Sequence, residues 1–204
     1  MKLDLHVHTK YSKDCSLELK DILKAARLQK LDGIAVTDHD TIKGGIETKK
    51  IAEGIEVIVG AEIRTDRGEV IGYFLEEEIK SRILKEVIDE IKSQGGVTCI
   101  PHPYDILRIY RLTPTKEIAK HIDCIEVFNS RCRLQVFNEK ALSFAIENNL
   151  GRTAGSDAHY LAEIGAGGVI VDLLEDLRGN LNPTIFGRKV SLLNLLAAKL
   201  DKML

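Results

Sequence analysis

The chain of 204 residues carries 29 Lys and Arg against 31 Asp and Glu, so its formal net charge is −2, and 44% of its residues are apolar. This length and composition are typical of a globular protein with a sizeable core, and we expect residues 1–204 to form a single domain. The balanced charge excludes a global basic surface for gripping duplex nucleic acid, and the lack of a long apolar run predicts no membrane partner and a cytoplasmic location.

Strand and helix patterns alternate along most of the chain. In chain order we expect a strand over residues 3–8, a helix over 16–30, a strand over 33–37, a helix over 41–53, strands over 56–65 and 69–75, a helix over 81–94 and a strand over 97–100. A helix over 113–122, a strand over 124–128, a helix over 133–149, strands over 152–156 and 167–172, and a terminal helix over 191–204 follow. This alternation predicts an α/β fold with parallel strands, either a barrel or an open sheet.

The opening strand raises a chemical question. Residues two apart on a strand point to the same side, so Asp4, His6 and His8 are expected to share one face and the intervening apolar residues the other. A face made of two imidazoles and a carboxylate requires a polar partner, such as a metal ion.

Metal-competent side chains recur at the ends of the later strands. In chain order these are Asp38, His39 and Asp40, then Glu62, His102, Glu126 with Asn129, and Asp157 with His159. With His6 and His8 they include five of the six histidines, and for the sixth, His121, we expect a structural role. Each alone can be explained by a turn, a helix cap or an ion pair. Their recurrence at one end of one sheet favours a barrel with a site for zinc, manganese or iron.

The four cysteines, Cys15, Cys99, Cys124 and Cys132, show no CxxC spacing. A domain of this size needs no disulfide framework to be stable. We therefore expect reduced, buried thiols.

The segments DLHVHTKYS, VTDHDT, GAE, PHP and GSDAH occur in this order between Asp4 and His159. As a set they resemble the motifs of the PHP (polymerase and histidinol phosphatase) family, and in particular its short stand-alone metal-dependent phosphoesterases. The resemblance implies a distorted (β/α)7 TIM-like barrel of the PHP type that holds two or three divalent metals, Mn²⁺, Zn²⁺ or Fe²⁺, and hydrolyses phosphoesters.

The resemblance also implies roles for individual residues. Its metal ligands would be His6, His8, Asp14, His39, Glu62, His102, Asp157 and His159. Of these, His6, His8, Glu62 and Asp157 would hold the first metal, His39, His159 and Asp14 a second, and His102 with Glu62 a third. The catalytic candidates are Asp38, which would orient ligands together with Asp4, and His159, which would protonate the leaving group.

One segment departs from the family pattern. Many family members carry a further histidine near the position of GYFL, and RGEVIGYFL contains none. Either Glu69 or a residue from elsewhere substitutes, or the third metal site is weak or empty.

Basic side chains in the predicted loops are candidates for binding substrate phosphate. We favour Arg131, Arg133 and Lys10, with Arg131 and Arg133 foremost because they directly follow a strand end. Further candidates are Lys43, Arg64, Arg108 and Arg111.

The leading hypothesis is a hydrolase that acts on a small phosphorylated substrate through a metal-activated hydroxide. The substrate would be a phosphomonoester, a nucleotide bisphosphate or the end of an oligonucleotide. Two alternatives stay open: a non-catalytic metal-binding accessory module, and an amidohydrolase-type enzyme that cleaves C–N bonds. Against the second, no lysine occupies a matching strand end.

Overall fold

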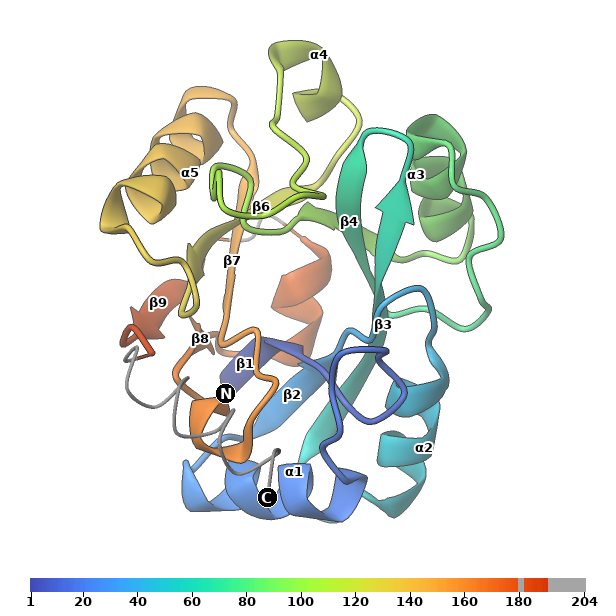
Figure 1. Ribbon diagram of the computed structural model, residues 1–204, viewed down its shortest axis with the longest axis vertical. Helices are drawn as coiled ribbons and strands as arrows, with labels where there is room; N and C mark the ends of the chain where they lie inside the picture. Colours follow the sequence, from blue (N-terminus) through green and yellow to red (C-terminus); the bar gives the residue numbers. More distant parts are fainter. Residues whose placement is uncertain (180–181, 191–204) are drawn as a thin grey trace.

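The computed structural model describes residues 1–179 and 182–190 and contains a mixed sheet that curls into a nearly closed barrel (Figure 1). Within these residues nine strands are hydrogen-bonded in the order β7-β6-β5-β4-β3-β2-β1-β8-β9. The strands are β1 (Lys2–Val7), β2 (Gly33–Val36), β3 (Glu56–Thr65), β4 (Gly68–Tyr73), β5 (Val97–Ile100), β6 (Cys124–Asn129), β7 (Gly151–Gly155), β8 (Gly167–Ile170) and β9 (Thr184–Gly187).

The longer helices lie around the outside of the sheet (Figure 1). The α-helices are α1 (Leu19–Leu28), α2 (Lys43–Ile51), α3 (Leu84–Ser93), α4 (Lys116–Ala119) and α5 (Gln135–Glu147), and there are short 3₁₀ helices η1 (Leu161–Glu163) and η2 (Leu174–Arg178). Leu177 of η2 packs with the strand residues Leu3 and Leu5. The helix α3 buries Leu84, Val87, Ile88 and Ile91, the i, i+3, i+4, i+7 spacing of an amphipathic helix on a core.

Strand direction determines where side chains meet. The pairs β1–β2, β2–β3, β5–β6 and β6–β7 are parallel, whereas β4 runs antiparallel to both β3 and β5. The carboxyl ends of β1, β2, β3, β5, β6 and β7 therefore open at one mouth, and the beginning of β4 opens there too. We refer to this end as the mouth of the barrel.

The barrel closes where the segment after β7 reaches β1. The Asp157 amide donates to the His6 carbonyl at 2.8 Å, and the His8 amide donates to the Ala158 carbonyl at 3.1 Å. A Cβ added to Gly155 would stand only 2.2 Å from the His6 Cβ. Glycine at this position is therefore what permits β7 to approach β1 closely enough to bring Asp157 beside His6.

Three apolar clusters support the sheet within the described residues, one mainly of strand residues inside the barrel and two that include helix residues outside it. Strand residues that include Leu3, Leu5 and Ile71 pack together inside the barrel, while Val7 packs outside with Ile22 of α1. The strict alternation expected along the opening strand is thus wrong at Val7, because the β1 register shifts between Asp4 and Val7. This shift lets Leu3 and Leu5 line the interior below His6 and His8.

The expected α/β barrel is confirmed as a mixed sheet that is nearly closed. The count of seven βα units is not confirmed, because β3 and β4 form a hairpin without a helix between them. The helix expected over 113–122 is shorter and spans Lys116–Ala119. The terminal helix expected over 191–204 lies outside the described residues. In the described part of the chain, no helix has the length and apolarity needed to cross a bilayer.

Candidate metal centre

Five strands deliver candidate metal ligands to the mouth of the barrel, and most of these side chains are buried. His6 and His8 come from the end of β1, His39 follows β2, Glu62 lies on β3, and His102 follows β5. Asp157 and His159 follow β7. The sequence places these residues up to 153 positions apart, and parallel strand ends bring them together.

His6, His8 and Asp157 form the deepest cluster, and all three are fully buried. The Nε2 atoms of the two histidines are 3.1 Å apart, and Asp157 Oδ1 lies 3.4 Å from His8 Nε2 and 3.7 Å from His6 Nε2. Ligands that each stand about 2 Å from one ion lie roughly 3–3.5 Å from one another. The spacing of these three atoms fits a shared divalent cation.

Glu62 lies between this cluster and two others. Its Oε2 is 3.3 Å from His6 Nε2 and 3.4 Å from His39 Nδ1, and its Oε1 is 2.9 Å from His102 Nε2. A carboxylate whose two oxygens face different imidazoles has the geometry of a bridging ligand.

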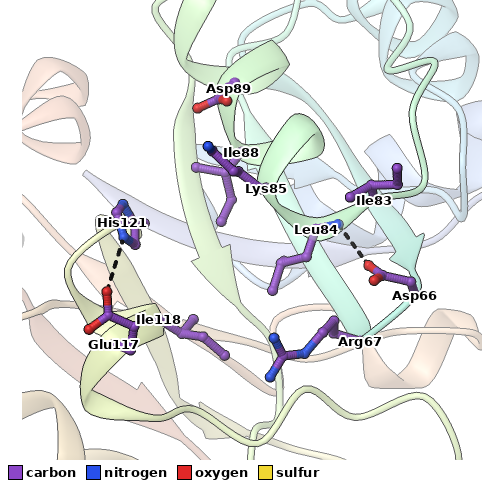
Figure 2. Close-up of a pocket in the computed structure, with 10 residues that line it drawn as sticks. All are labelled: Asp66, Arg67, Ile83, Leu84, Lys85, Ile88, Asp89, Glu117, Ile118 and His121. Carbon is purple, nitrogen blue, oxygen red and sulfur yellow. Dashed lines mark hydrogen bonds and ion pairs between the residues drawn. The ribbon is translucent and has the colours of Figure 1, made fainter.

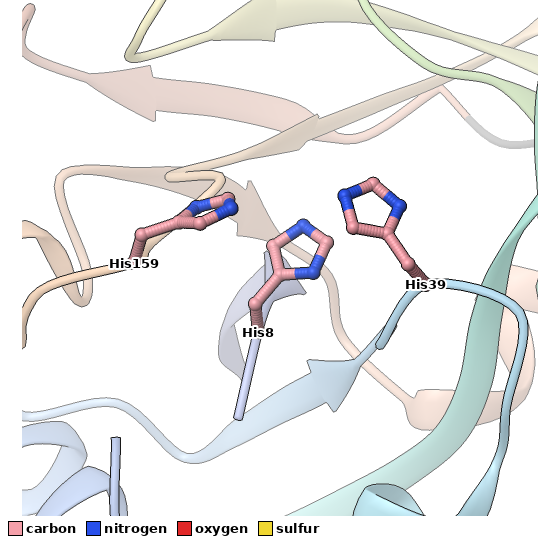
Figure 3. A group of neighbouring side chains, drawn as sticks. All are labelled: His8, His39 and His159. Carbon is pink, nitrogen blue, oxygen red and sulfur yellow. The ribbon is translucent and has the colours of Figure 1, made fainter. Parts of the chain in front are cut away.

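His8, His39 and His159 form a third cluster, in which the three rings converge from different strand ends (Figure 3). The ring centroids of His8 and His159 are 4.4 Å apart and those of His8 and His39 are 4.7 Å apart. Asp14, half exposed at the mouth, places Oδ2 3.0 Å from His159 Nε2 and 3.5 Å from His39 Nε2. All eight ligands predicted from the sequence therefore meet in one connected region.

Glu69 joins the same region from the start of the antiparallel strand β4. Its ligand atom lies within 4.8 Å of those of His39 and Glu62, and its Oε1 is 3.9 Å from His39 Nδ1. Glu69 is buried, and burial followed by the charge of Glu62 raises the pKa of Glu69 to about 8. A second buried carboxylate beside Glu62 is costly unless a cation compensates it.

An unpartnered oxygen shows that this donor set suits metal ions. Asp157 Oδ1 is buried and forms no hydrogen bond within the described residues, although nitrogens of His8, His159 and His6 lie 3.4, 3.5 and 3.7 Å from it. Its other oxygen, Oδ2, accepts from Asn129 Nδ2 at 3.2 Å and from the Arg108 guanidinium. A carboxylate held through one oxygen, with the other directed at histidine nitrogens, is arranged as a monodentate metal ligand.

The ionisable side chains of the centre shift one another's pKa values. Burial opposes ionisation of Asp157, but Arg108 and His6 hold the pKa of Asp157 well below its usual range. Burial likewise opposes protonation of His6, and the carboxylates of Asp157, Glu126 and Glu62 outweigh it and raise the pKa of His6. His8 differs, because burial and the charge of His159 lower the pKa of His8 to about 3. A neutral imidazole of this kind is ready to act as a ligand.

Two buried carboxylates position the ligand-bearing backbone. Asp4 Oδ1 accepts from the Ser156 amide at 2.8 Å and Asp4 Oδ2 from the Gly165 amide at 2.8 Å. Asp38 accepts from the Thr9 amide at 2.6 Å and the Thr9 hydroxyl at 2.7 Å. Both oxygens of Asp38 are thus engaged away from the three clusters, and its catalytic role stays a prediction.

Glu126, which the sequence placed at a strand end, supports two histidines. Its Oε1 is 2.9 Å from His6 Nδ1, which leaves His6 Nε2 for the centre, and its Oε2 accepts from the His102 amide at 2.8 Å. The sequence did not point to Glu163, whose Oε2 accepts from the His159 amide at 2.7 Å. Glu163 follows no strand end, so the pattern that identified the other residues could not find it.

The predicted phosphate-binding cations divide into two groups. Arg131 and Arg133, together with Arg108, line a polar cavity of about 230 Å³ that His159 and Asp14 also line. Arg131 Nη1 lies 2.6 Å from His159 Nδ1. Lys10 instead pairs with Glu18, at 2.8 Å, and is not among the residues that line this cavity.

A different cavity, of about 400 Å³, lies beside α3 and α4 (Figure 2). It is lined by residues that include Ile88, Ile118 and His121, and by none of the predicted metal ligands. His121 is exposed and lies 3.8 Å from Glu117, so the histidine that the sequence set apart does lie outside the metal centre.

Comparison with protein-family models identifies the family of this chain. The family model described as PHP domain matches residues 4–149, and the model described as PHP-associated matches residues 136–178. The chain belongs to the PHP domain family. The resemblance carried by the five sequence motifs is therefore confirmed.

Two uncharacterized proteins of Methanocaldococcus jannaschii are similar to this PHP domain protein. MJ1587 is 41% identical over 160 residues, which cover 72% of this chain and 92% of MJ1587. MJ0417 is 36% identical over 211 residues, which cover 100% of this chain and 82% of MJ0417.

Solved structures share the fold at lower identity. A two-domain protein of Bacteroides vulgatus that contains a predicted PHP-like metal-dependent phosphoesterase has a TM-score of 0.75 and 21% identity, over 99% of this chain and 69% of that chain. An amidohydrolase of Chromobacterium violaceum, with bound sulfate and no metal, has a TM-score of 0.65 and 16% identity, over 98% of this chain and 97% of that chain. These TM-scores show that the two proteins share the barrel fold of this chain.

Proposed function

We propose that residues 1–204 form one metal-dependent hydrolase domain that cleaves a phosphoester. The observation that supports this most is the buried Asp157 Oδ1, which faces the His6 and His8 nitrogens at 3.4–3.7 Å without a hydrogen bond in the described chain. Membership of the PHP domain family adds to it. The similarity to the Bacteroides vulgatus protein, with its predicted PHP-like metal-dependent phosphoesterase, favours the same reaction class.

The ligands would divide among two or three divalent ions, Mn²⁺, Zn²⁺ or Fe²⁺. His6, His8 and Asp157 would hold one ion, His39, His159 and Asp14 another, and Glu62 would bridge toward His102. When bound, such ions lower the pKa of water and neutralise the charge that develops on a phosphoryl group.

The protein's own cations would bind the substrate phosphate. Arg131 and Arg133 line the polar cavity next to His159, and a guanidinium pairs with phosphate through two parallel hydrogen bonds. His159 borders this cavity and would give a proton to the leaving oxygen where its ring does not hold an ion. Lys10 pairs with Glu18 at the surface and does not line this cavity, so its phosphate-binding role stays a prediction.

Hydrolysis assays test the proposal. Mn²⁺-supplemented protein is offered phosphomonoesters, nucleotide bisphosphates, short oligonucleotides and, for comparison, amides. We expect phosphate release that His8→Ala and Asp157→Asn abolish, while His121→Ala, a histidine variant outside the centre, retains it. Turnover of amides alone would favour C–N hydrolysis. Metal binding without turnover of any compound would favour an accessory module.

A further inference from the structure

A second cavity, of about 410 Å³, adjoins the metal centre on the side of the loop that follows β5. Asp14, His39, Leu107 and Arg108 line both this cavity and the polar cavity that contains Arg131 and Arg133, so Ile109 and Tyr110 are the apolar residues found in the larger lobe alone. The two cavities are therefore neighbouring lobes that flank the same metal ligands. A substrate held at the metals can extend into either lobe.

Charged side chains line much of the larger lobe, but one side of it is an apolar wall that faces water. Leu107 is 61% exposed, Ile109 87% and Tyr110 39%, and all three line the lobe. Large apolar side chains gathered beside a polar catalytic centre mark a place where an apolar group binds. Their exposure carries a hydration cost in the free protein that a bound apolar group would remove.

Hydrogen bonds hold this wall in place. The Arg108 amide donates to the Asp105 carbonyl at 3.0 Å, and the Glu69 amide on β4 donates to the Tyr110 carbonyl at 2.8 Å. Between these points the Arg108 side chain bonds to Asp157 in the metal centre. The flanking residues Leu107 and Ile109 are thus fixed at the lobe by the residue between them.

One part of the wall is planar. The Arg64 guanidinium carbon lies 3.3 Å from the centroid of the Tyr110 ring, which is a close cation–π stack. This stack fixes the orientation of the phenol ring. Flat π-surfaces combined with branched aliphatic side chains favour flat apolar guests over hydrated, flexible ones.

We infer that the larger lobe binds an aromatic or similarly planar apolar leaving group of the phosphoester. This inference rests on the proposed function. The phosphoryl group lies at the metal ligands and the polar lobe, and the ring lies against Leu107, Ile109 and Tyr110. On hydrolysis a water oxygen bonds to phosphorus, the bond from phosphorus to the leaving oxygen breaks, and a proton from the water ends on the leaving oxygen.

Binding of non-hydrolysable probes tests this inference independently of turnover. Calorimetry with the Mn²⁺-loaded full chain compares phenylphosphonate with methylphosphonate, which share the anionic group and differ in the ring. Ile109→Ser and the double variant Leu107→Ser/Ile109→Ser remove the apolar wall at exposed positions, where folding is little affected. The matched control is Ile106→Ser, in the same loop and 64% exposed, because Ile106 is not among the residues that line either lobe.

We expect the wild-type protein and Ile106→Ser to bind phenylphosphonate about tenfold more tightly than methylphosphonate, and the lobe variants to lose about threefold or more of that preference. Equal affinity for both probes, or a preference that survives in the double variant, would overturn the aromatic lobe and leave the proposed function standing. Failure of both probes to bind would count against the proposed function and the lobe together.

Discussion

The guanidinium of Arg108 donates a hydrogen bond to Oδ2 of Asp157, and the opposite oxygen, Oδ1, faces the nitrogens of His6 and His8. One carboxylate thus joins a loop residue to the deepest ligand cluster. Arg108 also lies 3.5 Å from Asp105 on its own loop, so the guanidinium spans two carboxylates. In the metal-free protein it is the nearest permanent cation to Asp157, and bound metal ions would take over much of that compensation.

Replacing Arg108 therefore has an effect that depends on metal. We expect Arg108→Met to destabilise the metal-free protein by about 1–3 kcal/mol, because it leaves a buried carboxylate without its charged partner. The loss should be clearly smaller in the Mn²⁺-loaded protein. Thermal denaturation with EDTA and with Mn²⁺ measures both values, and equal losses under the two conditions would show that Arg108 does not compensate Asp157.

The variant Glu69→Gln tests whether the Glu69 carboxylate is a metal ligand. We expect Glu69→Gln to lower the number of tightly bound Mn²⁺ ions by about one per chain, because the amide keeps the shape of the side chain and loses its charge. The cluster of His6, His8 and Asp157 should keep its ion. Equilibrium dialysis with elemental analysis gives the stoichiometry. An unchanged metal count in Glu69→Gln would mean that Glu69 is not a ligand.

The affinity for Mn²⁺ should rise with pH because His39 must lose a proton before it can bind the metal. Burial opposes protonation of His39, but Asp14 and Glu62 outweigh it and raise the pKa of His39 to about 9. The ring is therefore protonated at pH 7, and a metal must displace that proton to bind. We expect Mn²⁺ affinity to increase between pH 6.5 and 8.5, with a smaller increase for His39→Asn. Anaerobic calorimetry at pH 6.5, 7.5 and 8.5 measures it, and identical slopes for the two proteins would exclude His39 as the source.

The same raised pKa of His39 has a consequence for stability. Since the folded pKa lies above the unfolded value of 6.5, the stabilising contribution is fully present below pH 6.5 and is lost as pH rises through about 9. The metal-free protein should accordingly lose part of its stability over this interval, and His39→Asn should lose less.

The positions of most ligands could be predicted because they depend on strand direction alone. A residue at the carboxyl end of a parallel strand must lie at the mouth of the barrel, and this places His6, Glu62 and Asp157 together before any distance is known. Periodicity was enough to identify these strands. The contacts of Lys10 and Arg108 were not predictable in this way, because loop conformation and the choice of ion-pair partner leave no periodic pattern.

Glu69 illustrates a different limit. A residue at the beginning of a strand would lie far from the mouth if every strand were parallel. Because β4 runs antiparallel in a hairpin with β3, Glu69 pairs in register with Arg64 and lies at the mouth instead. The short connection between the two strands, at residues 66–67, is the sequence feature that excludes a helical crossover there.

Barrel closure at Gly155 links the fold to the site. We expect Gly155→Ala to destabilise the protein by about 3 kcal/mol or more, because the new Cβ would stand 2.2 Å from the His6 Cβ and neither backbone can move freely. Metal affinity should fall with it, since Asp157 follows β7 directly in the segment that reaches β1. Gly54→Ala offers a control, because nothing lies within 4 Å of its added Cβ, although its φ of +66° makes alanine mildly strained. Similar unfolding midpoints for the two variants in urea would contradict the role given to Gly155.

Anomalous scattering from crystals soaked in Mn²⁺ shows whether these strand ends build one multi-metal site, on which every other expectation depends. We predict two or three anomalous peaks at the mouth, with the strongest within coordination distance of His6, His8 and Asp157 and another beside His39 and His159. Fully soaked crystals with no peak among His6, His8 and Asp157 would contradict the multi-metal site.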